Sequence, residues 1–81
     1  MTDARNLPRL SPVEAAQRDY AQHLIMISEF ADLAARATAV GDTYGASRYA
    51  RHAHEHMRES WRVLVRWRDE MERQKGARSC A

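Results

Sequence analysis

The amino-acid sequence predicts an all-α protein, an antiparallel hairpin of two long helices. Two segments, residues 12–40 and 43–74, carry apolar side chains at helical spacing, and no proline occurs after the first position of the first segment. A short run containing Gly41 and Gly45 separates them, and no stretch alternates apolar and polar residues as a strand would. Ala, Arg, Glu, Leu and Met dominate, a composition typical of helical proteins. Eighty-one residues are enough for one domain at most.

We expect three parts along the chain: a flexible arm at 1–11, the hairpin at 12–75 and a frayed tail at 76–81. The arm mixes charged and polar residues with a proline and has no helical periodicity. The second helix is expected to end near Gln74, because Gly76 follows and glycine commonly stands just beyond a helix C-terminus.

The first helix has a clear start signal at Ser11-Pro12-Val13-Glu14. The Ser11 hydroxyl can accept from the Glu14 backbone N–H, and the Glu14 carboxylate can accept in return from the Ser11 N–H, which is a capping box. Pro12 occupies the first helical position, where a missing N–H costs nothing. The first helix is therefore predicted to begin at Pro12 and to continue to about Val40.

The apolar arc of segment 12–40 is wide. Two adjoining stripes cover about half of the circumference, whereas one neighbouring helix buries an arc of about 100°. The helix should therefore need two neighbours. Two polar residues, Asp19 and His23, lie four apart within this arc, where they could bond to one another; the alternative is that this edge of the arc is exposed to water. The stripes consist of Val13, Ala16, Tyr20, Leu24, Ile27, Ala31 and Ala34, and of Met26, Phe30, Leu33, Ala37 and Val40.

The turn between the helices spans residues 41–45. Gly41 is suited to the left-handed conformation that ends a helix, and Asp42 or Thr43 can cap the next one. Gly45 should weaken the first turn of the second helix, and Ser47 offers a later start. So short a connection makes the helices antiparallel neighbours.

The second helix has one long apolar stripe, with small residues at its start and large ones toward its end. Because the first helix can cover only part of the combined apolar surface, we expect two hairpins to complete a four-helix bundle by dimerisation, or a helical partner to do so. The stripe is formed by Ala46, Tyr49, Ala50, Ala53, Met57, Trp61, Leu64, Trp67 and Met71.

The large residues at the end of this stripe form the predicted partner-binding site. Trp61 and Trp67 are almost a third of a circle apart, so one helix cannot cover both equally. Trp and Arg are favoured anchors at protein interfaces. Arg68 lies within the stripe, where an acidic group on a second chain would account for it. The predicted site comprises Trp61, Leu64, Trp67, Arg68 and Met71.

Around the turn the chain resembles a single tetratricopeptide repeat, over about residues 31–56. The resemblance rests on Gly41-Asp42 with alanines before it and Ala46, Tyr49 and Ala53 after it. There is no second repeat, no terminal proline, and the second helix exceeds one repeat length. The resemblance implies two closely packed helices near the turn. In size and helix order, the chain is also similar to the small hairpin co-chaperones of type III secretion.

A row of arginines on the second helix suggests an alternative, binding to nucleic-acid phosphates. The acids Glu55, Glu59, Asp69 and Glu70 are interleaved with the row at helical spacing and should neutralise much of it. Two long helices joined by a short turn are also not a helix-turn-helix motif. We therefore expect a solvated face rather than a nucleic-acid site. The candidate residues for the nucleic-acid alternative are Arg48, Arg51, Arg58, Arg62 and Arg66.

A second alternative is a metal-binding bundle, because His52, His56 and Glu59 lie at i, i+4 and i+7 on one flank. The string His52-Ala53-His54-Glu55-His56 also matches an inverted zinc-protease pattern, but 81 residues leave no room for a substrate domain. The expectation is a solvated flank without metal or other cofactor.

Several function classes are excluded by what is missing. No nucleophile–base set, phosphate loop or carboxylate pair is recognisable, so we predict a protein that is not an enzyme. The only cysteine is Cys80, and neither a membrane-spanning run nor a signal peptide is present. The sequence predicts a cytoplasmic protein-interaction module: an adaptor, a co-chaperone or an inhibitor, such as a mobile-element inhibitor of a host nuclease complex. Its expected partners are a second copy of itself, another protein, or both, and not nucleic acid or a membrane.

Overall fold

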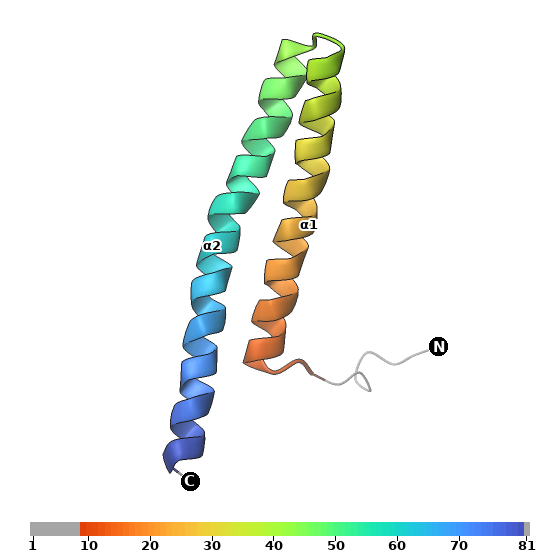
Figure 1. The fold of residues 1–81 in the computed structure, drawn as a ribbon. Coiled ribbons are helices and arrows are strands. Elements are labelled where there is room, and N and C mark those ends of the chain that lie inside the picture. The colour runs from red at the N-terminus through yellow and green to blue at the C-terminus, as the bar shows by residue number, and fades with distance from the viewer. Residues whose placement is uncertain (1–8, 81) are drawn as a thin grey trace, which may run out of the picture.

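The computed structural model describes residues 9–80, with side chains described for 9–77. It is an antiparallel hairpin of α1 (Pro12–Ala39) and α2 (Thr43–Cys80) (Figure 1). The hairpin is a single layer, 12 Å in its thinnest dimension. The predicted fold class is thus confirmed. Most of the predicted arm at 1–11 lies outside the described residues.

The start of α1 forms as its sequence signal predicts. The Glu14 N–H donates to the Ser11 hydroxyl over 3.1 Å, and the Ser11 N–H donates to the Glu14 carboxylate over 3.5 Å. Pro12 is the first helical residue. This capping box satisfies two backbone donors that the helix itself cannot pair.

A three-residue connection, Val40 to Asp42, reverses the chain. Gly41 adopts a φ of 75°, and the N–H groups of Gly41 and Asp42 donate to the carbonyls of Thr38 and Ala37. These two bonds form a Schellman motif, which requires the left-handed conformation that glycine adopts without strain. The connection therefore ends α1 and begins α2 within a few residues.

Asp42 belongs to both helix ends. Its N–H closes the Schellman motif of α1, while its carboxylate accepts from the Gly45 N–H over 2.9 Å as the N-cap of α2. A Cβ at Gly45 would lie 2.9 Å from the Asp42 Cγ, so a side chain there would push the capping carboxylate aside. We expected Gly45 to weaken this turn and Ser47 to offer a later start. Instead α2 begins at Thr43, and the glycine leaves room for the cap.

The predicted end of α2 near Gln74 is wrong, because the helix continues through Gly76 to Cys80. Gly76 does not take the positive φ that would end a helix there. A glycine inside an exposed helix costs about 1 kcal/mol relative to alanine, which is too little to stop a helix that no proline interrupts. As a result, α2 extends beyond the start of α1 (Figure 1).

The interface between the helices is thin, and its most buried residues are small or polar. Among the described residues, the buried ones are Ala16, Ala37, Gly45, Ser60 and Val63. Ser60 is only 3% exposed, and its hydroxyl donates a hydrogen bond to the Met57 carbonyl of its own helix over 2.7 Å. No large side chain in the described part of the chain is completely buried. A hairpin held in this way has little apolar burial of its own.

Candidate docking face

One line of α2 residues faces α1, which we call the inner seam. Its members are either buried or in ring contact with α1, and they recur at steps of 4, 3, 4, 4, 3 and 4 residues. This spacing keeps one side of a helix toward its neighbour. The inner seam consists of Gly45, Tyr49, His52, His56, Ser60, Val63 and Trp67.

A second line, the outer seam, lies one residue further along and therefore about 100° around the helix. It repeats the same steps and is at least as apolar as the inner seam, yet it is much less covered. Trp61 is 63% exposed and Met57 is 52% exposed. The outer seam consists of Ala46, Ala50, Ala53, Met57, Trp61, Leu64 and Arg68.

Helix α1 contributes to the same broad side of the hairpin. The Tyr20 and Trp67 rings meet between the helices, with centroids 6.0 Å apart. Leu24, one turn after Tyr20, is exposed on that side, whereas Asp19 points to the opposite side and pairs with Arg66. We call the outer seam together with Leu24 and Met71 the docking face.

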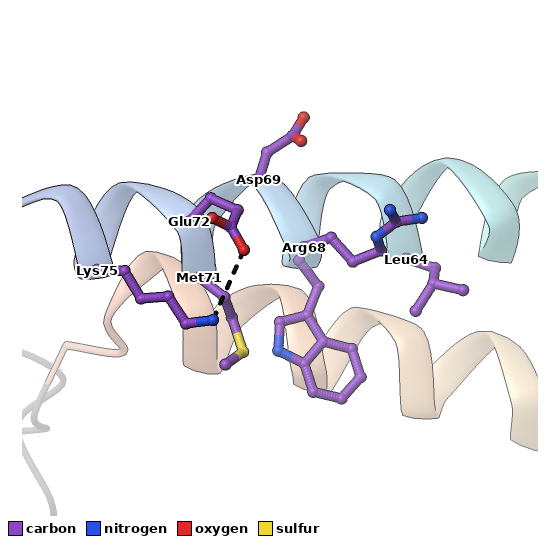
Figure 2. Close-up of a pocket in the computed structure, with 7 residues that line it drawn as sticks. Leu64, Arg68, Asp69, Met71, Glu72 and Lys75 are labelled. Carbon is purple, nitrogen blue, oxygen red and sulfur yellow. Dashed lines mark ion pairs between the residues drawn. The ribbon is translucent and has the colours of Figure 1, made fainter.

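A hollow of ≈ 500 Å³ lies on the docking face near the open end of the hairpin (Figure 2). Leu64 and Met71 line it with their apolar side chains, and Arg68 lines it with its charged one. The Lys75 ammonium at its edge is 3.7 Å from the Glu72 carboxylate. The hollow therefore has an apolar floor and charges of both signs around it, which is the usual layout of a protein interface.

The two tryptophans have different environments, as their angular separation predicts. Trp67 packs against Tyr20, and its indole N–H is buried without an acceptor among the described residues. Trp61 projects into solvent. Of the five residues of the predicted partner-binding site, four lie on the docking face, and Trp67 belongs to the inner seam and also lines the hollow.

The opposite face of α2 carries the arginine row, and part of the row is neutralised. Arg62 pairs with Glu59 over 3.3 Å and Arg73 with Glu70 over 2.9 Å, as the interleaved acids predict. Arg66 instead pairs with Asp19 of the other helix. Within the described residues, no ion pair involves Arg48, Arg51 or Arg58, the three exposed arginines nearer the turn. The arginines without an ion pair therefore form only a short and interrupted positive stretch along α2.

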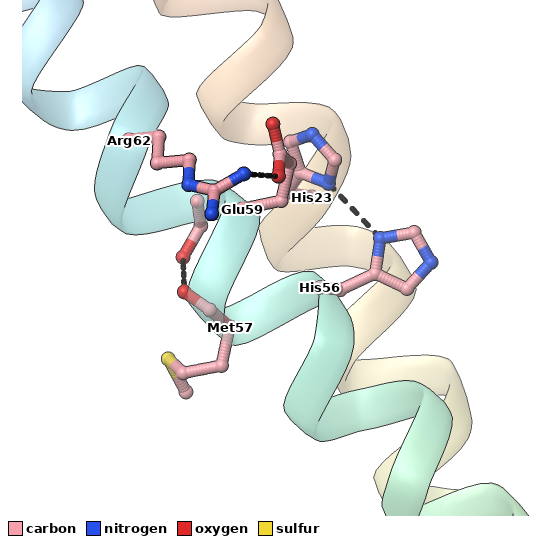
Figure 3. A network of polar contacts seen from close by, with 6 residues as sticks. His23, His56, Met57, Glu59 and Arg62 are labelled. Atoms are coloured by element: carbon pink, nitrogen blue, oxygen red, sulfur yellow. Dashed lines mark hydrogen bonds and ion pairs between the residues drawn. The ribbon is translucent and has the colours of Figure 1, made fainter.

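The middle of the hairpin is held by a pair of histidines that the sequence did not reveal. The Nδ1 atoms of His23 and His56 are 2.9 Å apart, so one ring donates a hydrogen bond to the other (Figure 3). Phe30 stacks against His52 and His56, with ring centroids 5.0 and 5.8 Å apart. Asp19 and His23 have no hydrogen bond to one another among the described contacts, because each has a partner on α2 instead.

The candidate metal ligands are not brought together. His56 bonds to His23, Glu59 pairs with Arg62, and His52 lies 3.7 Å from Glu55. Among the described residues, no group of three or more His, Cys, Asp or Glu side chains could hold a metal ion. His52 and His56 therefore pack against Phe30 of α1, and Glu59 pairs with Arg62 on its own helix.

Neither described helix combines the length and the apolar character needed to cross a membrane. In comparisons with known proteins, no family model, curated protein or solved structure matches the chain. The resemblance to a tetratricopeptide repeat and to hairpin co-chaperones therefore stays a prediction.

Proposed function

We propose that this protein is a protein-interaction module that acts by placing its docking face on another protein surface. One observation carries the proposal: the outer seam repeats the spacing of the inner seam, but the hairpin leaves four of its seven residues exposed, Met57 and Trp61 among them. A sustained seam of this kind is used where a second helix packs against it.

Energetics support an assembled form. The apolar side chains that the hairpin buries are small, whereas Leu24, Met57, Trp61 and Met71 are all more than two-fifths exposed on one face. Covering apolar surface stabilises by about 25 cal/mol per Å², so covering these four side chains would add stability that the hairpin alone does not have. Small domains with thin cores commonly gain their stability through oligomerisation or a partner.

The proposal includes a role as adaptor, co-chaperone or inhibitor in the cytoplasm, without catalysis. It assigns the docking contacts to the docking face rather than to the arginine row. Asp19, Glu59 and Glu70 neutralise part of the row, and this supports a protein partner over nucleic acid.

Matched charge substitutions on the two faces of α2 test the proposal. We expect Trp61→Glu and Arg68→Glu to abolish or weaken capture of the partner from a lysate of the native host, followed by mass spectrometry. Arg51→Glu and Arg58→Glu, in the arginine row about 90 to 110° around α2 from the outer seam, should affect capture less. Helix content measured by circular dichroism should survive in all four variants, because none of these residues is buried in the hairpin.

Trp67→Ala is a less specific test than the sequence suggested. Trp67 supports Tyr20 inside the hairpin, so its loss should lower stability as well as binding. If Arg51→Glu and Arg58→Glu abolish capture while Trp61→Glu does not, the docking face is wrongly assigned. A salt-sensitive complex with DNA or RNA at submicromolar concentration would favour the nucleic-acid alternative.

A further inference from the structure

The outer seam is symmetrical in spacing about Met57 and asymmetrical in size. Ala53 and Trp61 lie four residues before and after Met57, and Ala50 and Leu64 lie seven residues before and after it. The half nearer the turn thus carries only methyl side chains, and the half nearer the open end carries large ones. Each small position has a large counterpart at the same distance from Met57.

We propose that a second copy of this chain covers the docking face, with its turn at the opposite end and a two-fold axis passing near Met57. This inference rests on the proposed function and names the occupant. In this arrangement Trp61 of one copy lies over Ala53 of the other, and Leu64 lies over Ala50. Large side chains then fill the space that small ones leave, which is how helical layers interdigitate. Two hairpins stacked in this way form a four-helix bundle.

The opposite orientation, with both turns at one end, fits less well. Trp61 and Leu24 lie at similar distances from the turn, about 25 to 29 Å along their helices. Stacking the hairpins with both turns together would place large residues over large residues at the open end. The alanine-rich halves would then face each other across a gap, and gaps in a core lose packing energy.

Charge placement favours the same orientation. Arg68 lies eleven residues after Met57, so its counterpart eleven residues before Met57 is Ala46. Asp42 lies one helical turn further on, at the N-terminus of α2. The long Arg68 side chain of one copy can therefore reach the Asp42 carboxylate of the other. Because a two-fold axis makes every contact twice, the dimer gains two such pairs.

A size swap tests the register. We expect Ala50→Leu alone, which overfills the contact, and Leu64→Ala alone, which empties it, each to raise the dimer dissociation constant by about tenfold or more. The variant carrying both changes should recover most of that loss. Ala50 and Leu64 are fourteen residues apart on one straight helix, about 21 Å, so they cannot compensate within one chain. Sedimentation equilibrium measures the three constants, and circular dichroism checks that each hairpin is folded.

Spin labels report the orientation independently of these variants. Tyr44, which is 77% exposed, is replaced by cysteine in a Cys80→Ser background and labelled. Turns at opposite ends place the two Tyr44→Cys backbones about 39 Å apart, thirteen residues from the axis on each side. Turns at one end place them within about 20 Å, because neighbouring helix axes lie 8 to 10 Å apart. A label-to-label distance within about 20 Å would overturn the inference. A double variant whose dimer dissociation constant is raised by as much as the two single changes combined would also overturn it.

Failure of this inference can be told apart from failure of the proposed function. One outcome is a chain that stays monomeric in light scattering at high concentration but captures a host protein through Trp61 and Arg68. This outcome would rule out a second copy as the occupant and would still support the docking face. A dimer with the expected label distance and a successful size swap supports both.

Discussion

The two seams of α2 have the same spacing and differ by a single residue in register, but their environments are opposite. The inner seam holds the hairpin together with two histidines, a serine and a glycine among its seven residues. The outer seam has three alanines, a methionine, a leucine, a tryptophan and an arginine, and four of these seven residues are exposed, Met57 and Trp61 among them. A hairpin that is monomeric in solution would gain more stability if its more apolar seam faced the other helix.

The difference supports the proposal that the docking face packs against a second protein surface. In the hairpin interface, polar residues are acceptable because they pair across the helices, as His23 does with His56. Apolar side chains have no such local solution and require an external surface. The polar seam therefore gives the fold a specific register, and the apolar seam is available for assembly. The following variants test this division, each with a matched control on an exposed position.

The largest expected effect is at Ala16, which is completely buried between the helices. Ala16→Leu should lower the free energy of unfolding by up to about 3 kcal/mol, because the close approach leaves no room for three more carbons. Ala21→Leu, an exposed position on the same helix, is the control and should change little. Urea denaturation at one fixed protein concentration measures both. Equal effects at the two positions would mean that the helices do not approach closely at Ala16.

Val63 is the next test, since it is 6% exposed in the inner seam. Val63→Ala should cost about 2 kcal/mol through lost burial and the space left behind. Val65→Ala removes the same atoms from a position two residues on that is exposed, and should cost less than half as much. If the control loses as much stability as Val63→Ala, the inner seam has been placed on the wrong side of α2.

The histidine pair should contribute less than the apolar contacts. His56→Ala removes the hydrogen bond to His23 and the stacking on Phe30, and should cost about 1 to 2 kcal/mol. The control is His54→Ala, on the exposed side of the same helix. His56→Asn should recover part of the loss, because an amide can bond to the His23 ring in the same place. If His54→Ala loses as much stability as His56→Ala, the His23–His56 pair does not stabilise the hairpin specifically.

The smallest effects are expected at the cap of α2. Asp42→Ala should cost about 1 kcal/mol through loss of the capping bond to Gly45. Gly45→Ala alone should be nearly neutral, because its gain in helix propensity of about 1 kcal/mol is offset by displacement of the Asp42 carboxylate. In the Asp42→Ala background, Gly45→Ala should show its full gain. Thermal denaturation of the four proteins in this double-mutant cycle checks the coupling. Strict additivity would show that the two residues do not interact.

Local signals predicted the backbone well because each of them acts within a few residues. The capping box at Ser11 and the glycine at 41 form as expected, and both depend on contacts between neighbours in sequence. The end of α2 was mispredicted because Gly76 carries only a small energetic penalty, which the rest of the helix overcomes. The sequence placed Trp61, Leu64, Arg68 and Met71, four members of the proposed docking face, near one stripe. Met57 and Leu24 were missed as members because only burial shows that they are uncovered.

By itself, the sequence determined that this protein is two helices joined by a tight turn, because helix caps, glycine conformation and apolar periodicity are properties of short segments. The tertiary structure alone decided which side of α2 meets α1. Two seams with the same spacing compete for that position, and periodicity cannot choose between them. The choice follows from pairings across the hairpin, His23 with His56 and Asp19 with Arg66, between residues 33 and 47 apart in the chain. Together with the ring contacts of Tyr20 and Phe30, they hold the inner seam against α1, and Met57 and Trp61 of the outer seam stay exposed.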